Sequence, residues 1–279
     1  MARYGLLIDV TRCNGCYNCQ IACKDEFFEN HYPPYSLPQP GTGHFWIRIE
    51  EKERGKYPWV KVTYTPIPCM HCENAPCMKG DGAGAVYRRK DGIVLIDPEK
   101  AKGLKGIVDS CPYGVIYWNN ELKVPQKCTL CAHLLDKGWK EPRCVDACPT
   151  LALRFGDLDD SNSEIAKTMA SKNIEHLHPE FGTNPRVLYA NYPKLFIAGS
   201  LVFGDTDECG EGASVSLWTP SGVEVHHQKA NSFGDFEFDN VGEQGSYQLK
   251  ISAEGYETKF ISVDLKGDIY LEEIVLHRR

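Results

Sequence analysis

The stretch Cys13-Asn-Gly-Cys16-Tyr-Asn-Cys19-Gln-Ile-Ala-Cys23 decides the fold of this chain. Its spacing, C-x2-C-x2-C-x3-C, is typical of loops that wrap a [4Fe–4S] cluster, where three thiolates bind one cluster and the fourth binds a neighbouring cluster. Zinc sites instead present two separated ligand pairs to a single tetrahedral ion. Four cysteines this close together therefore favour iron–sulfur chemistry over zinc, and Cys23 needs a partner motif elsewhere in the chain.

The partner motif lies more than one hundred residues further on, and its last cysteine is followed by Pro149. If the fourth cysteine of each motif serves the cluster of the other motif, the two motifs give two complete ligand sets. The first predicted set consists of Cys13, Cys16, Cys19 and Cys148. The second predicted set consists of Cys23, Cys128, Cys131 and Cys144.

The middle of the chain holds a third set of four cysteines, which are Cys69, Cys72, Cys77 and Cys111. Four other positions of the motif pattern have lost their cysteines and carry Asp81, Ala101, Leu104 and Ile107. Under the exchange rule, all four of these positions would have served one and the same cluster. The pattern therefore indicates a four-cluster scaffold from which one cluster is absent. We expect three [4Fe–4S] clusters on this chain, and plain solvent rather than a metal at Asp81.

Few other residues suggest chemistry. Cys209 stands apart from the motifs and is expected to be a free thiol on a β loop. His71 and His133 lie one or two residues from cluster cysteines, so each could donate a hydrogen bond to a cluster sulfur. We expect instead that both have a surface or packing role. No catalytic residue and no cofactor site beyond the clusters is expected.

Composition limits the function. The chain has 279 residues, enough for two domains, and a net charge of −7, which makes nucleic acid an unfavourable partner. No signal peptide or membrane-spanning stretch is visible, so we expect a cytoplasmic protein without direct membrane insertion. In that setting, thirteen cysteines favour metal binding over disulfides.

The hydrophobic patterns predict an α+β chain in three parts. Residues 1–155 are expected to form a duplicated ferredoxin-like domain, with a strand at 4–10 and a helix at 17–25. Its predicted β-hairpins cover 45–65, 85–96 and 115–124. Residues 156–194 are expected to be an extended connector with a short helix at 161–171. Residues 195–279 contain seven short runs separated by turn signals, which predict a seven-stranded β-sandwich.

Residues 1–150 resemble the iron–sulfur β subunits of the dimethyl sulfoxide reductase superfamily of molybdenum enzymes, which usually carry four clusters. Over nearly its whole length the chain is similar to the small subunits of pyrogallol–phloroglucinol transhydroxylases. That similarity is carried by Pro68–Cys77, Gly92–Lys100, Cys111–Gly114 and Gln126–Asp136. The resemblance implies three clusters and a C-terminal β-sandwich of the transthyretin-like or carboxypeptidase-regulatory-like kind.

The resemblance also implies a partner. This would be a large catalytic subunit that holds molybdenum on two pterin guanine dinucleotides and acts on polyhydroxylated benzenes, in a heterodimer or a multiple of it. The ending Cys148-Pro149-Thr150 is more regular than expected for a transhydroxylase. It leaves open a related aromatic hydroxylase or reductive dehydroxylase. An electron-transfer subunit of a respiratory reductase and a free-standing polyferredoxin also stay open.

Overall fold

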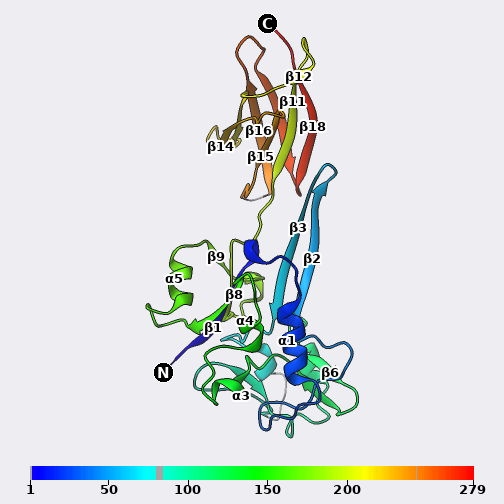
Figure 1. Ribbon diagram of the computed structural model, residues 1–279, viewed down its shortest axis with the longest axis vertical. Coiled ribbons are helices and arrows are strands. Elements are labelled where there is room, and N and C mark those ends of the chain that lie inside the picture. Colours follow the sequence, from blue (N-terminus) through cyan, green and yellow to red (C-terminus); the bar gives the residue numbers. More distant parts are fainter. Residues whose placement is uncertain (1, 80–83, 243) are drawn as a thin grey trace. The chain divides into compact units, whose positions relative to one another are not determined.

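The computed structural model describes residues 2–79, 84–242 and 244–279 (Figure 1). The chain divides into two compact units. The first unit comprises Met1–Lys52 and Thr63–Tyr192, and it mixes short helices with small sheets. The second comprises Glu53–Val62 and Pro193–Arg279, and in the described part it contains strands without helices. The predicted α+β class, with a mostly β C-terminal region, is confirmed.

A four-stranded sheet forms the frame of the first unit. Its order is β8-β1-β10-β9, which are Leu153–Asp157, Tyr4–Asp9, Val187–Ala190 and Ile174–Glu175. Strand β1 is buried on both faces, since Leu6, Leu7 and Ile8 are each 0% exposed. Leu6 and Ile8 pack into the main core of the unit, whereas Leu7 packs against a smaller cluster under helix α5. This two-sided burial explains why the run is continuously apolar rather than alternating.

The other elements of the first unit are short. The two small hairpins are β4–β5 (Val86–Arg88 and Val94–Ile96) and β6–β7 (Tyr117–Asn119 and Val124–Gln126). The α-helices are α1 (Asn18–Phe27), α2 (Gly106–Asp109), α3 (Ala132–Leu135), α4 (Arg143–Asp146) and α5 (Glu164–Ala170). The 3-10 turns are η1 (Val10–Arg12), η2 (Pro76–Met78) and η3 (Pro179–Phe181). The first strand, the first helix and the two small hairpins lie where the sequence predicts them.

The structure differs from the extended connector expected at 156–194. Strands β9 and β10 in this segment join the sheet of the first unit, and β10 runs parallel to β1. All four β10 residues are buried, so this segment contributes to the core rather than lying outside it. The predicted helix is present as α5, but its N-cap is Ser163, whose hydroxyl accepts a hydrogen bond from the Ala166 N–H at 3.2 Å. The predicted cap, Ser161, lies two residues too early.

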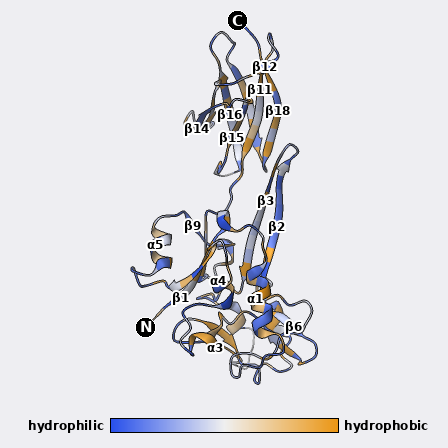
Figure 2. Cartoon of the chain, viewed as in Figure 1, coloured by the Kyte–Doolittle hydropathy of each residue, from blue (hydrophilic) through white to orange (hydrophobic). Residues whose placement is uncertain are grey.

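The first predicted hairpin is longer than expected. Strands β2 (Ile47–Lys56) and β3 (Trp59–Pro68) meet at Tyr57-Pro58, three residues beyond the expected turn at Arg54-Gly55-Lys56. Most of β2 is hydrophilic (Figure 2). The tip of the hairpin, Glu53–Val62, belongs to the second unit. A domain boundary that falls inside a hairpin cannot be read from local sequence patterns.

The second unit has two four-stranded sheets. In one sheet, β11 (Ile197–Phe203) pairs with β12 (Glu208–Cys209), β15 (Asp235–Phe238) and β18 (Ile269–Leu276). The order of the other is β14 (Glu224–Lys229), β13 (Ser214–Trp218), β16 (Gly245–Ser252) and β17 (Lys259–Leu265). Apolar residues of both sheets form one core cluster, including Leu201 from the first and Leu249 from the second. The described strands number eight rather than seven because β12, only two residues long, follows the first predicted run.

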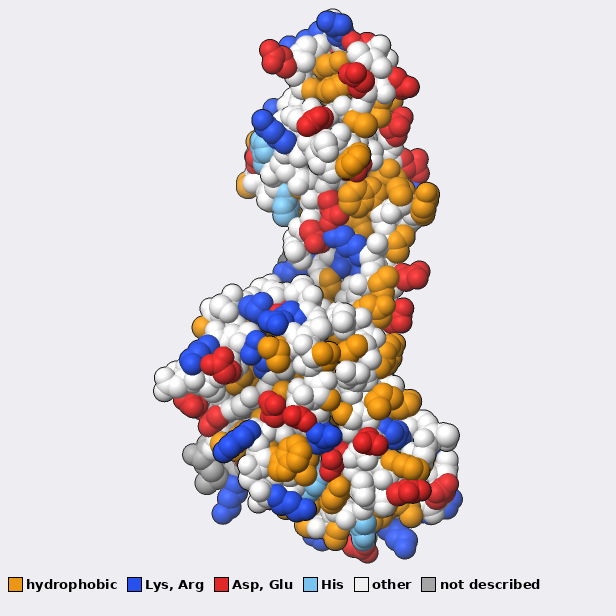
Figure 3. Space-filling model, viewed as in Figure 1, with side chains coloured by type: hydrophobic (Ala, Val, Ile, Leu, Met, Phe, Trp, Pro, Cys, Tyr) orange, Lys and Arg blue, Asp and Glu red, His pale blue; other side chains and the backbone are white. Residues whose placement is uncertain are grey.

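The surface and the helices carry two further observations. Acidic and basic side chains are interspersed on the face of the molecule that Figure 3 shows. Among the described residues, no helix is long and apolar enough to cross a membrane.

Candidate metal centres

The pairing of β1 with β8 brings the two ends of the cysteine motifs together. Ile8 on β1 lies opposite Leu153 on β8, and the two strands are antiparallel. Cys13 follows Ile8 by five residues and Cys148 precedes Leu153 by five residues, so both cysteines leave the sheet at the same end. A hydrogen bond of 2.8 Å from the Arg12 side chain to the Thr150 carbonyl joins the two loops. The fold therefore supplies a physical reason for the predicted sharing of one site.

The first group of thiols gathers at this end of the sheet. Burial raises the pKa of the Cys19 thiol to about 12, and three nearby thiols add to the rise. Those three belong to Cys13, Cys16 and Cys148. Such mutual influence requires the four thiols to lie close together, because a like charge disfavours ionisation only at short range. The four members of the first predicted ligand set are thus neighbours in the structure.

The loop between Cys13 and Cys16 depends on Gly15. Its φ is +70°, a conformation that side chains other than glycine rarely adopt. A Cβ atom at this position would also lie 2.5 Å from the ring of Tyr64. Both conditions require glycine, so this residue lets the loop turn tightly under the aromatic ring.

The second group of thiols gathers between α1, α4 and the loop before α3. Burial raises the pKa of Cys23 well above its usual value, and the Cys128 and Cys131 thiols add to the rise. Burial likewise raises the pKa of Cys144, with further contributions from Cys131, Cys128 and Cys23. Cys23 therefore lies with the cysteines of the last motif, although it shares helix α1 with Cys19. This is the arrangement that the exchange rule predicts.

The third group surrounds a cavity. The cavity encloses about 340 Å³ of empty space, and its walls include all four cysteines of the third predicted set, which are Cys69, Cys72, Cys77 and Cys111. Burial raises the pKa of Cys72 to about 12, and Cys69 is the largest further cause. A hydrogen bond from Thr183 to the Cys72 thiol opposes that rise. An enclosed space with four thiols in its walls fits a bound cluster in both chemistry and form.

The three groups follow one another in a row. The Cys19 thiol of the first group raises the pKa of Cys144 in the second, after burial and the nearer thiols. After burial, Cys69 of the third group is the largest cause of the raised pKa of Cys128, which is about 11. The row is most open at its ends, because Cys16 is exposed and Cys13 and Cys111 are half-buried. All four cysteines of the second group are buried.

The donor chemistry of these groups also fits iron–sulfur clusters. All thirteen cysteines are free thiols. Among the described residues, no three His, Cys, Asp or Glu side chains are placed to hold one metal ion together. In a cubane cluster each cysteine binds its own iron, so the four thiolates surround the cluster without meeting at a point. Because burial and mutual repulsion keep the thiols protonated, metal binding at these groups must release protons.

Aliphatic side chains fill the position of the absent fourth cluster. Ala101 and Ile107 are 0% and 1% exposed in the main core, and Leu104 packs against that core. Asp81, the fourth position of this predicted set, lies outside the described residues. Three of the four positions thus pack into the core as ordinary apolar residues, in agreement with the sequence-based interpretation.

This packing yields a first prediction. Ile107→Ala should leave a cavity and lower the free energy of unfolding by about 2–5 kcal/mol. For a unit of this size, that corresponds to a loss of roughly 5–15 °C in the temperature at which heating bleaches the cluster absorbance. The matched variant Val108→Ala, at a half-buried neighbour, should cost clearly less. Equal effects of the two variants would contradict a packed core at this position.

The two histidines near the clusters are buried, which excludes the expected surface role but agrees with packing. Burial lowers the pKa of His71 well below its usual value, so its ring is neutral. Its Nδ1 accepts a hydrogen bond of 3.1 Å from the Val94 N–H, so its Nε2 carries the proton. His71 also lines the cavity of the third group. His133 stacks on Tyr32 with ring centroids 3.9 Å apart, and its Nε2 lies 3.0 Å from a carboxylate oxygen of Glu26.

Sequence reasoning missed three residues near these groups. Gln39 lies against the Cys23 thiol, Thr183 lies against Cys72, and Lys127 lines the third cavity. Thr183 and Gln39 are far from any cysteine in the sequence, so no motif marks them. The only local signal for Lys127 is its position directly before Cys128.

Comparison with known proteins agrees with these sites. Residues 60–158 match the model of the 4Fe-4S dicluster domain family. The chain is 48% identical to the small subunit of pyrogallol hydroxytransferase from Pelobacter acidigallici over 262 residues, 91% of this chain and 92% of that relative. It is 33% identical to the arsenate respiratory reductase iron–sulfur subunit of Shewanella sp. strain ANA-3 (67% and 95%). It is 34% identical to one subunit of the tetrathionate reductase of Salmonella typhimurium (70% and 75%).

The cysteine groups and the matched domain together define a protein that binds [4Fe–4S] clusters. The chain belongs to the iron–sulfur subunits of the dimethyl sulfoxide reductase family of molybdenum enzymes, together with the small subunit of pyrogallol hydroxytransferase. Its relatives in this family are electron-transfer subunits rather than catalytic ones.

Proposed function

We propose that this chain holds three [4Fe–4S] clusters and conducts electrons between them. The clusters are bound by the three cysteine groups described above, in the order in which the groups follow one another. The observation that carries the proposal is this row of four-thiol groups, buried in the middle and more open at both ends. An electron relay needs closely spaced centres and an accessible centre at which electrons enter or leave.

We propose a large catalytic subunit as the partner, with molybdenum bound by two pterin guanine dinucleotides. The chain itself contributes no active site. Support comes from the relative named as a small subunit of pyrogallol hydroxytransferase, which implies a larger companion. The substrate class is polyhydroxylated benzenes, and the free thiols fit a reducing compartment such as the cytoplasm. The second unit is proposed to be a β-sandwich of the transthyretin-like or carboxypeptidase-regulatory-like kind.

A reductive dehydroxylase of aromatic substrates is the second candidate. The regular ending Cys148-Pro149-Thr150 favours it, since that ending differs from the one expected for a transhydroxylase. The two candidates differ in electron balance. A transhydroxylase moves a hydroxyl group between two rings without net oxidation or reduction, whereas a dehydroxylase consumes electrons that the clusters of this chain would deliver.

Anaerobic purification of the complex tests the proposal. We expect a second, larger chain and molybdenum to copurify with this chain. The complex should convert pyrogallol when a tetrahydroxybenzene co-substrate is supplied, without any external electron donor. Turnover that requires a reduced donor and no co-substrate would favour the dehydroxylase. Absence of both molybdenum and a second chain would contradict either form of the proposal.

A further inference from the structure

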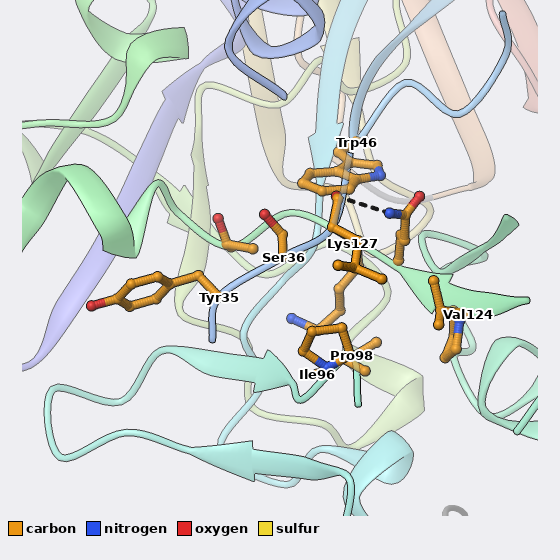
Figure 4. Close-up of a pocket in the computed structure, with 11 residues that line it drawn as sticks. Tyr35, Ser36, Trp46, Ile96, Pro98, Val124 and Lys127 are labelled. Atoms are coloured by element: carbon orange, nitrogen blue, oxygen red, sulfur yellow. Dashed lines mark hydrogen bonds between the residues drawn. The ribbon is translucent and has the colours of Figure 1, made fainter. Parts of the chain in front are cut away.

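Lys127 is a buried cation in the first unit. Its side chain is 3% exposed, although lysine is among the residues that are almost never fully buried. It directly follows β7 and directly precedes Cys128. Figure 4 shows the side chain extending from the region of Trp46 toward Ile96 and Pro98, near the end of β5. The neighbouring side chains therefore enclose the ammonium group.

Backbone oxygens hold the ammonium group in place. Its Nζ donates hydrogen bonds to the carbonyl of Val94 and, at 3.2 Å, to the carbonyl of Cys128. In the part of the chain that the structure describes, no carboxylate forms an ion pair with it. A buried charge without an opposite charge is costly, because it loses its hydration and gains no ion pair. The protein must therefore supply negative charge near Lys127 in another form.

The second and third cysteine groups are the negative charge nearest to Lys127. The residue lines the cavity that is walled by the third group, and it hydrogen-bonds to the carbonyl of Cys128, which belongs to the second group. Its charge also opposes the rise that burial causes in the pKa of Cys77, of Cys111 and of Cys128. No cation is among the causes of the raised pKa of Cys13 or Cys19 in the first group.

We propose that Lys127 is the shared counter-charge of the second and third clusters and raises their reduction potentials relative to the first. The inference rests on the proposed three-cluster function. A cluster bound by four thiolates is an anion, and it gains one further negative charge when it takes up an electron. A fixed cation in a low-dielectric interior stabilises the reduced form more than the oxidised form, so reduction becomes easier.

The expected consequence is a gradient along the row. Electrons that enter at the exposed first cluster are held preferentially on the two inner clusters, and most strongly on the third, where Lys127 lines the cavity. Arg88 also donates to the Cys72 carbonyl at 2.7 Å, but it lies at the third group alone. Lys127 is the cation that the second and third groups share.

A redox titration of the anaerobically purified full chain, with any partner that copurifies, tests this proposal. The signals of the clusters are followed by electron paramagnetic resonance at one fixed pH. In Lys127→Met, the reduced fraction of the third cluster at a fixed potential should fall about tenfold, which is ~59 mV for one electron. The second cluster should shift in the same direction, and the first should not shift. Lys127→Arg keeps the charge and should titrate like the unchanged protein.

Lys167→Met serves as the matched control, because Lys167 is exposed on α5 and pairs with Glu164. Iron content, measured on every variant, separates the two levels of the proposal. Fewer than three clusters in the unchanged protein would contradict the proposed function itself. Three clusters with unshifted potentials in Lys127→Met would overturn only the role of Lys127. If Lys127→Met loses the inner clusters, their retention in Lys127→Arg supports the proposal, and their loss in both variants contradicts it.

Discussion

Replacing Cys23 with serine is expected to remove the second cluster and to leave the first cluster in place. Cys23 stands on α1 only four residues after Cys19, yet its thiol lies with those of Cys128 and Cys131. Iron should therefore fall from about twelve to about eight per chain, since a [4Fe–4S] cluster needs its full set of ligands. The signal that remains should include that of the cluster at Cys13, Cys16 and Cys19.

Three further variants make this result specific. Cys144→Ser should give the same spectrum as Cys23→Ser, because both cysteines belong to the second group. Cys16→Ser should give the complementary result, with the first cluster altered and the second retained. Cys209→Ser should leave iron unchanged, since this thiol is exposed on β12 in the second unit. If Cys23→Ser and Cys16→Ser damage the same cluster, the exchange of ligands between motifs is wrong.

Arg54→Met is expected to produce the largest loss of stability in the second unit. The guanidinium group of Arg54 is 7% exposed and donates to both carboxylate oxygens of Asp268, at 2.7 and 3.0 Å, as well as to the Lys194 carbonyl. Asp268 in turn accepts the Phe196 N–H at 3.0 Å. Removing one partner leaves a buried, uncompensated carboxylate, which costs about 3–5 kcal/mol. Urea unfolding, followed by hydrogen exchange of the β11 amides, measures this loss.

The control for this prediction is a second ion pair of the same unit. Lys56 and Glu272 lie 2.7 Å apart, but both side chains are more than half exposed. Lys56→Met should therefore change stability by less than about 1 kcal/mol. The double variant Arg54→Met/Asp268→Leu should recover much of the loss, because an apolar pair leaves no buried charge. A cost for Arg54→Met as small as that for Lys56→Met would show that the buried pair does not hold the hairpin tip.

The sequence predicts the cysteine groups well because their ligands lie at fixed spacings. Helix α1 brings Cys19 and Cys23 close together by its period, and the exchange rule then pairs distant motifs without knowledge of the fold. The α+β class and the small hairpins follow from equally local signals. For the same reason, the absent fourth cluster can be inferred from the residues that replaced it, as the burial of Ala101 and Ile107 illustrates.

Features that depend on distant pairing could not be predicted. Strand β10 has only four residues, and it is recognisable as a strand because β1 offers it a parallel edge. The hairpin tip with Arg54 finds its partner Asp268 more than two hundred residues away. Lys127 resembles any surface lysine in the sequence, and its burial follows from the packing of β5, β7 and the cysteine loops around it. Local patterns contain no signal for such contacts.

The central claim of three clusters is tested most directly by iron and acid-labile sulfide, measured on the anaerobically purified full chain. The three cysteine groups predict about twelve irons and about twelve sulfides per chain. The value should be the same in the Cys209→Ser variant. A value near eight would show that one of the three groups holds no cluster. A value near sixteen would show that the fourth site, despite Ala101 and Ile107, still binds one.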